Sequence, residues 1–140
     1  MSNSVLALLG FAGWTLLLVL TTITLRSWIF LINRRASAEF KPDGSDVSPF
    51  HMRLCRAHAN CVENLPIFGV IVLTAIVTGH SEVTDALALW VLLARIGQSL
   101  THLLSTSNLA ITVRVTFFSV QLAIEAYWAI ELVKIALGSQ

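Results

Sequence analysis

The stretch RLCRAHANCVENLPIFGVIVLTAIV, residues 53–77, decides the fold because its two halves differ in polarity. The first half contains two arginines, two asparagines and a glutamate, whereas the second half is almost purely apolar. Charged side chains inside a bilayer cost free energy unless they face one another or water. We therefore interpret the stretch as one membrane helix, in which the polar half lines a cavity and the apolar half is the anchor.

The composition of the whole chain indicates a lipid-embedded protein. Of its 140 residues, 56% are hydrophobic and only 12% are charged, with a mean hydropathy of +0.78. Soluble domains are usually about one-quarter charged, so this chain is too apolar for that class. No basic cluster is larger than Arg34-Arg35, which argues against a nucleic-acid partner. Cys55 and Cys61 lie on opposite sides of one expected helix, so no disulfide between them is predicted.

Hydropathy predicts an all-α fold, a single integral-membrane domain over residues 1–140 built as a four-helix bundle. The helices are expected at residues 5–34, 51–78, 83–104 and 109–137. The first contains an uncharged run that can cross a hydrocarbon core of about 30 Å at about 1.5 Å per residue. We interpret this run as a retained membrane span, because it is too long and its start too uncharged for a signal peptide.

Loop charges predict the orientation. The connection after the first helix contains Arg34, Arg35 and Lys41, whereas the next connection contains no Lys or Arg. Positively charged loops favour the cytoplasmic side. The first loop is therefore expected in the cytoplasm and both termini on the opposite side.

Three of the expected helices each carry one stripe of charged and polar side chains. These stripes consist of Arg53, Arg56, Asn60 and Glu63; of Arg95, Gln98 and His102; and of Arg114, Gln121 and Glu125. At about 100° per residue, each set falls on one side of its helix. Stripes inside a membrane must face one another or water. The sequence therefore predicts a cationic cavity that opens toward the cytoplasm.

Several stripe residues also have a structural interpretation. Glu63 and Arg95 are expected at similar depths, roughly 15–18 Å from the cytoplasmic face, where they can form a buried ion pair that fixes helix register. Arg34 and Arg53 lie near helix ends, where arginines extend toward lipid headgroups. His102 can be a solvated helix cap. For these residues the sequence leaves ligand binding and structure as alternatives.

Other polar residues receive structural interpretations. Arg26 is expected to be structural or to reach the headgroups. Glu125 lies beyond the cluster and is expected to be protonated or hydrogen-bonded to a neighbouring helix. His51, His58 and His80 lack the spacing of metal ligands, so no metal site is predicted. No Ser-His-Asp, Walker or dinucleotide-binding pattern is present in the sequence.

Arginines, an amide and one carboxylate at a membrane surface suit a ligand with carboxylates and an amine. Arginine offers paired donors to carboxylates, and Glu63 can hold an ammonium group. A partly desolvated arginine also lowers the pKa of a thiol and makes the thiolate available as a nucleophile. Anion transport would use similar groups, so residue types alone leave the ligand open.

The segment RLCRAHANCVENLPIF resembles the signature of the MAPEG family, the membrane-associated proteins in eicosanoid and glutathione metabolism. That signature is an Arg, an Asn four residues later, a Glu three residues after that and a Pro shortly beyond. The corresponding residues are Arg56, Asn60, Glu63 and Pro66. The resemblance covers nearly the whole chain, including the Arg34-Arg35 loop and the Ala94-Arg95 pair.

The resemblance implies a homotrimer that binds glutathione as a co-substrate between neighbouring subunits, near the cytoplasmic face. Its peptide would be bound by Arg56, Asn60 and Glu63, with Arg34 approaching from the adjacent subunit. Arg114 would match the arginine beside the thiol and stabilise the thiolate. The remaining expected members of the glutathione site are Arg53, Arg95 and His102.

Three positions depart from the eicosanoid enzymes of the family. His102 stands where a tyrosine is usual, Gln98 stands where some members have a histidine, and Asn64 replaces the tyrosine of the leukotriene-forming branch. The segment between His102 and Arg114 is also longer than in the mammalian enzymes. These differences argue against a prostaglandin or leukotriene synthase. They favour a bacterial-type glutathione transferase or peroxidase of an inner membrane, with a role in detoxifying lipophilic compounds.

Two other functions compete with this interpretation. One is a non-catalytic lipid-binding protein of the lipoxygenase-activating type, in which glutathione has no role. The other is a small four-helix exporter. Proton-coupled exporters of this size carry a glutamate in the first helix, and residues 5–35 contain no acidic residue.

Overall fold

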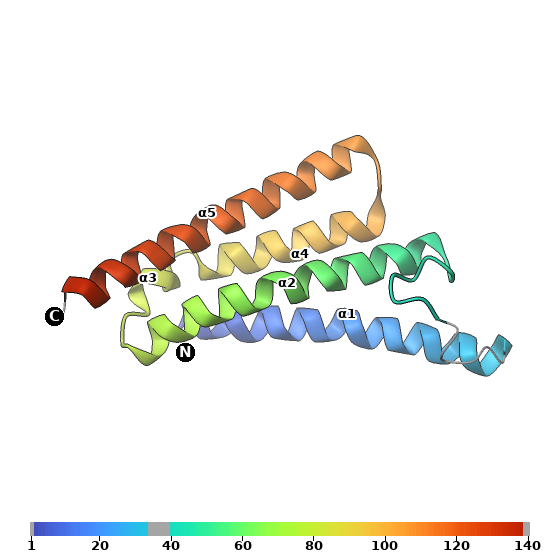
Figure 1. Ribbon diagram of the computed structural model, residues 1–140, viewed down its shortest axis with the longest axis horizontal. Coiled ribbons are helices and arrows are strands. Elements are labelled where there is room, and N and C mark those ends of the chain that lie inside the picture. The colour runs from blue at the N-terminus through green and yellow to red at the C-terminus, as the bar shows by residue number, and fades with distance from the viewer. Residues whose placement is uncertain (1, 34–39, 139–140) are drawn as a thin grey trace.

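The structure consists of helices packed side by side along their lengths (Figure 1). The computed structural model describes residues 2–33 and 40–138, and these contain no β-strand. The helices are α1 (Asn3–Asn33), α2 (Pro49–Val77), α3 (Glu82–Asp85), α4 (Ala88–Leu104) and α5 (Asn108–Gly138). The prediction of an all-α fold is confirmed for the described residues.

The helices expected at residues 5–34, 51–78 and 109–137 correspond to α1, α2 and α5. The helix expected at residues 83–104 is divided into two. Its first turn is the separate helix α3, and the main part begins only at Ala88. The Asp85 carboxylate accepts hydrogen bonds from the backbone N–H and the hydroxyl of Ser4, at 2.8 and 2.6 Å. The Ser4 hydroxyl also lies 2.6 Å from that of Thr84. These bonds hold α3 against the start of α1, so the chain turns before α4 begins.

Three helices are long and apolar enough to cross a membrane. They are α1, α2 and α5, and α4 is a shorter apolar helix. Most of their large apolar side chains face outward; Leu31, Val70 and Val77, for example, are 72%, 65% and 82% exposed. An outer surface of this kind is stable in lipid and not in water. The structure therefore supports a membrane protein.

The described ends of the chain lie at the same end of the molecule. The start of α1 and the end of α5 are there, together with the connection from α2 to α3 (Figure 1). The start of α2 and the connection from α4 to α5 lie at the opposite end (Figure 1). This second end carries the polar half of α2, and we call it the polar end.

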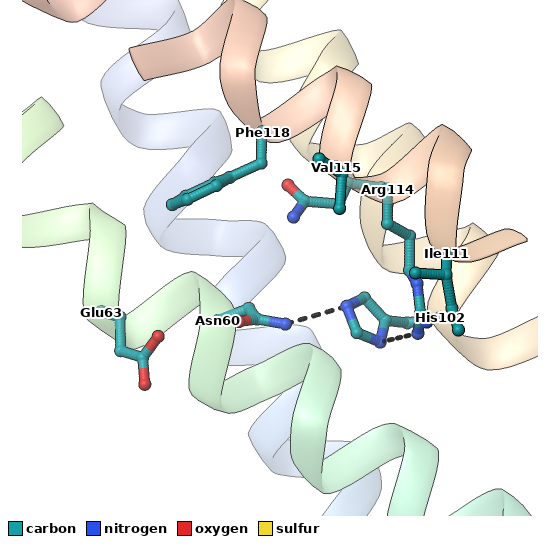
Figure 2. Close-up of a pocket in the computed structure, with 8 residues that line it drawn as sticks. Asn60, Glu63, His102, Ile111, Arg114, Val115 and Phe118 are labelled. Atoms are coloured by element: carbon teal, nitrogen blue, oxygen red, sulfur yellow. Dashed lines mark hydrogen bonds between the residues drawn. The ribbon is translucent and has the colours of Figure 1, made fainter. Parts of the chain in front are cut away.

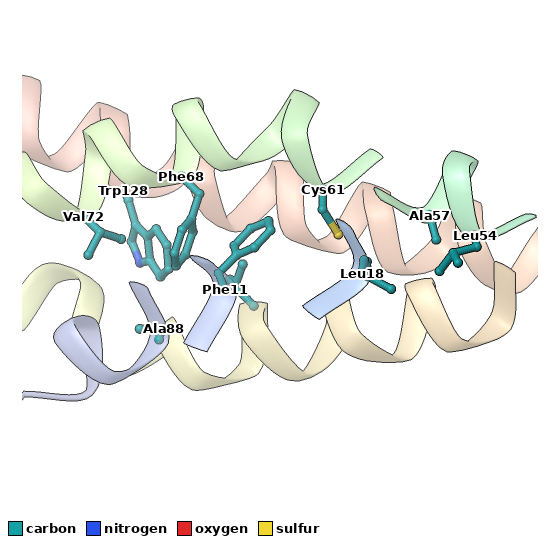
Figure 3. Packing of buried hydrophobic residues seen from close by; sticks show 11 residues of the cluster. Phe11, Leu18, Leu54, Ala57, Cys61, Phe68, Val72, Ala88 and Trp128 are labelled. Atoms are coloured by element: carbon teal, nitrogen blue, oxygen red, sulfur yellow. The ribbon is translucent and has the colours of Figure 1, made fainter. Parts of the chain in front are cut away.

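The aromatic part of the apolar core lies in the half of the bundle nearer the termini, and smaller buried apolar side chains continue the core toward the polar end (Figure 3). Phe11, Phe68 and Trp128 are fully buried there, and Phe68 lies between the other two rings at centroid distances of 5.1 and 6.2 Å (Figure 3). Lipid is as apolar as these side chains, so close packing rather than exclusion of water holds such helices together. The aromatic contacts therefore join α1, α2 and α5 at this level.

A group around Arg26 holds the first loop at the polar end. Arg26 donates from Nε to Nε2 of His51, over 3.1 Å, and from Nη2 to the carbonyl of Lys41, over 2.9 Å. Gly44 has a φ of +72°, and a Cβ there would lie 2.6 Å from the His51 ring. Ser48 caps α2 by accepting the N–H of His51. These contacts fix the start of α2, which agrees with the structural interpretation of Arg26.

Candidate active site

A cavity of about 280 Å³ opens between α2, α4 and α5 at the polar end (Figure 2). Polar and apolar side chains share its wall. The lining residues are Asn60, Glu63, Gln98, His102, Ile111, Arg114, Val115 and Phe118. Four members of the predicted glutathione site therefore meet around one space, with apolar residues of α5 beside them.

His102 is the centre of the polar wall. Its Nδ1 lies 2.7 Å from Nη1 of Arg114, and its Nε2 lies 2.8 Å from the side-chain amide of Asn60 (Figure 2). Arginine only donates, so Nδ1 must accept and Nε2 must carry the proton of a neutral imidazole. The Asn60 atom placed beside Nε2 is the amide nitrogen, which also only donates. Because the nitrogen and oxygen of an amide are almost indistinguishable in shape, turning the amide over lets its oxygen accept from Nε2–H. His102 thereby orients both neighbours.

A tight connection brings His102 and Arg114 together. His102 lies in the last turn of α4, and Arg114 lies near the start of α5. Between them, Ser107 accepts the N–H of Ala110 through its hydroxyl and so caps the start of α5. The connection reverses the chain within a few residues, which places the two side chains on facing helices.

Arg53 and Arg95, both predicted members of the site, donate to backbone carbonyls beside the cavity and do not line it. Arg53 donates from Nε to the carbonyl of Leu103, over 2.9 Å, and so satisfies the end of α4. Arg95 is fully buried and donates from Nη1 to the backbone carbonyl of Asn60, over 3.3 Å. Both support the cavity wall through backbone carbonyls.

The suggested ion pair between Glu63 and Arg95 is not formed. The ion pairs that join described residues are His80–Glu82 and Lys134–Glu131, and Nε and Nη2 of Arg95 have no hydrogen-bond partner. Glu63 is exposed on the outer side of α2, whereas Arg95 enters the bundle interior. Figure 2 shows Glu63 and His102 on opposite sides of Asn60. The similar depths inferred from sequence were insufficient, because the two side chains leave their helices in different directions.

The remaining predicted residues are separate from this cluster. Arg56 is exposed on α2 and does not line the cavity. Arg34 lies outside the described residues. Within residues 2–33 and 40–138, no three His, Cys, Asp or Glu side chains gather as metal ligands would.

Sequence reasoning missed Asn64 as a site-supporting residue. Its amide donates to Oε1 of Glu125 over 2.8 Å, and both side chains are buried. One interpretation of Glu125, a hydrogen bond to a neighbouring helix, is thus confirmed. The signal for Asn64 was its position one helical turn after Asn60 on the same face. Phe118 could have been found in the same way, because it lies one helical turn after Arg114 on α5 and also lines the cavity.

The arrangement suits an anion beside an apolar wall. Arg114 uses one of its five donors for His102, so the guanidinium can offer others to a ligand. Phe118 and Ile111 provide apolar surface on the α5 side of the cavity. A negative charge is stabilised more strongly by an arginine where water is partly excluded.

Comparison with known protein families gives one match, to the model of the MAPEG family, over residues 11–134. The chain belongs to the MAPEG family. The matched part of this MAPEG protein includes every residue that lines the cavity. The family comprises membrane proteins, among them glutathione transferases and peroxidases as well as non-enzymatic members. No match was found among curated proteins or among solved structures.

Proposed function

We propose that this MAPEG protein is a membrane-bound glutathione-dependent transferase or peroxidase that acts on lipophilic electrophiles or hydroperoxides. One observation carries the proposal. Arg114 lies on the wall of a cavity at the polar end, held by His102 and next to apolar residues of α5. A family with glutathione-dependent members and a guanidinium beside an apolar surface together favour thiol activation.

The proposed chemistry begins with loss of the thiol proton. Arg114 stabilises the thiolate, and the proton goes to water, because His102 already accepts from Arg114 at Nδ1 and a second cation there would be repelled. For an electrophile, a sulfur lone pair forms the new bond to carbon and the leaving group departs with its bonding pair. For a hydroperoxide, sulfur attacks the terminal oxygen, the O–O bond breaks, and the alkoxide takes a proton. A second glutathione then converts the sulfenic product to disulfide and water.

Asn60, Glu63 and Arg56 are proposed to hold the peptide part of glutathione. Glu63 and Arg56 are exposed in the isolated chain, although they lie on a membrane helix. Exposed charges there favour a ligand or another subunit that covers them. Arg95, Arg53 and His102 support this site from behind or from the side.

A homotrimer is proposed as the assembly, with Arg34 of one subunit reaching the site of the next. The face between α2 and α5 supports it, because hollows of about 280, 230 and 350 Å³ follow one another along the two helices. Such a face is incompletely packed in one chain. A second subunit would fill it and cover Glu63.

The proposed orientation has four spans. The 17 residues of α4 are at the lower limit for crossing, about 17–25 residues. Four spans agree with the shared end of the described termini (Figure 1). The polar end would face the cytoplasm of a bacterial cell, with the protein in the inner membrane.

The test uses Arg114→Ala in detergent-purified protein. The thiolate absorbance of bound glutathione should disappear, whereas calorimetry should still detect glutathione binding through the peptide part. Lys134→Ala, on the exposed far end of the same helix, is the matched control and should leave both signals unchanged. Thiolate absorbance equal to wild type in Arg114→Ala would contradict the assignment.

A second candidate is a non-catalytic lipid-binding protein. It is favoured by the hollow of about 230 Å³ at mid-bundle, in which Glu125 is the one polar lining residue beside Ile67, Ile71, Leu122, Ala126 and Ala129. A hollow of this polarity suits an acyl chain. Calorimetry decides between the candidates, because absence of glutathione binding at millimolar concentration would favour the lipid-binding protein.

A further inference from the structure

Two buried charged residues have no part in the proposed chemistry. Arg95 on α4 is 0% exposed, and Glu125 on α5 is 2% exposed. Arg95 lies between two aromatic rings, with its guanidinium carbon 5.3 Å from the centroid of Phe11 and 5.8 Å from that of Phe118. Charged residues in such places are costly and therefore mark a function or a specific structural role.

Both residues reach the same turn of α2. Arg95 donates to the backbone carbonyl of Asn60 over 3.3 Å, and Glu125 accepts from the side chain of Asn64 over 2.8 Å. Asn60 and Asn64 are four residues apart, which is about 6 Å along a helix axis. One charge therefore holds the beginning of this turn and the opposite charge holds its end.

This turn of α2 needs support from outside. Pro66 lies within α2 and has no N–H, so the helix loses the hydrogen bond that would accept at residue 62, in the middle of the turn. Asn60 at its beginning is the residue that contacts His102 in the cavity. A small rotation of the turn would move Asn60 away from His102.

The unsatisfied atoms of the two residues are complementary. Nε and Nη2 of Arg95 are buried donors without a partner, and Oε2 of Glu125 and Oδ1 of Asn64 are buried acceptors without one. Buried polar atoms are almost always paired, either directly or through an enclosed water that makes about three hydrogen bonds. A bridging water would satisfy donors and acceptors together.

We propose that Arg95 and Glu125 form a water-bridged charge pair inside the bundle, which fixes the Asn60–Asn64 turn of α2 and thereby holds Asn60 against His102. Both are positioning residues that act through α2 without touching a ligand. The pair itself is independent of glutathione. Only its effect on glutathione affinity rests on the proposed function.

The pair is tested by a double-mutant cycle in the thermal unfolding of the full chain in detergent. Arg95→Met and Glu125→Leu should each lower the Tm, since each leaves one buried charge without its partner. The double variant should unfold closer to wild type than either single variant. The exposed pair Lys134 and Glu131, changed to Met and Leu, is the control cycle and should give additive effects.

Additive losses in the Arg95 and Glu125 cycle would overturn the pair. If Glu125→Leu does not fold, Glu125→Gln provides the same cycle, because the amide oxygen still accepts from Asn64 while the charge is gone. The double variant with Arg95→Met should then again be more stable than the sum of the two single losses predicts.

The positioning role is tested by nitrogen NMR of histidine-labelled protein without glutathione. Wild type should give the His102 pattern of a proton on Nε2, with the signals assigned by their loss in His102→Gln. The folded Arg95 and Glu125 double variant should shift these signals, whereas Lys134→Met should not. Unchanged His102 signals would overturn the positioning role. Where glutathione turnover is measurable, the double variant should raise KM severalfold with a smaller change in kcat.

Discussion

The two ends of the bundle are held together by different forces, although the same helices form both. Near the termini, the fully buried rings of Phe11, Phe68 and Trp128 pack against one another in tilted pairs from three helices. At the polar end, His102 and Arg114 are joined by hydrogen bonds around an open cavity. Pro66 of α2 lies between the two regions. The apolar end therefore anchors the helices by packing, whereas the polar end depends on the direction of individual hydrogen-bond donors.

The largest expected effect comes from a substitution that disrupts only the polar end. Arg114→Ala should lower kcat about 10²–10³-fold, the usual loss when one donor to a developing anion is removed. The thermal unfolding midpoint should stay near that of wild type, because the apolar end is unchanged. Steady-state kinetics with a lipophilic electrophile and thermal unfolding measure the two effects. A Tm loss as large as that of a core variant would show that the two ends are not separable.

The second prediction concerns a substitution that disrupts the packing of the apolar end. Phe68→Ala should cost about 3–5 kcal/mol, because the surrounding helices cannot close around the lost ring. Val70→Ala is the matched control on the same helix, since Val70 is 65% exposed and faces lipid. Unfolding in detergent measures the loss, and calorimetry should find glutathione affinity nearly unchanged in the variants that fold. A strong loss of affinity would indicate that the core also positions the cavity.

A substitution with a smaller effect distinguishes a supporting role of Arg53 from direct contact with glutathione. Arg53→Met removes the donor to the Leu103 carbonyl and should cost about 1 kcal/mol of stability. Glutathione affinity should fall only slightly, because His102 in the same turn of α4 loses some support. Calorimetry is the measurement. Complete loss of binding would instead place Arg53 in direct contact with glutathione, as the sequence pattern predicted.

The smallest effect concerns the contact between α3 and α1. Hydrogen bonds from the Ser4 hydroxyl, and then from its backbone N–H, lower the pKa of Asp85 from its usual 3.8. The stabilisation is complete above pH 3.8 and is lost as the pH falls through the lowered pKa. Asp85→Asn should therefore reduce the acid dependence of the Tm at pH values below about 4. The Tm measured against pH checks this, and identical acid dependence in variant and wild type would contradict it.

Local patterns predicted much of the fold and part of the site. Long apolar runs located α1, α2 and α5, and the polar stripes identified Asn60, His102 and Arg114, which do meet at the cavity. The separation of α3 from α4 could not be predicted, because it depends on hydrogen bonds between Ser4 and Asp85, which are 81 residues apart in the sequence. The partner of Arg95 could not be predicted for a similar reason. A guanidinium can donate to a backbone carbonyl or to a carboxylate, and the packing of the helices decides which acceptor lies within reach.

Signature spacing and hydropathy predicted the family, the membrane character and the approximate positions of α1, α2 and α5, because these are properties of neighbouring residues. The tertiary structure alone decided how each charge is used. It directed Arg114 toward His102, Arg53 toward the end of α4, and Arg95 away from Glu63 into the bundle. Long side chains extend several ångströms from their helices, so their partners depend on how separate helices pack and rotate.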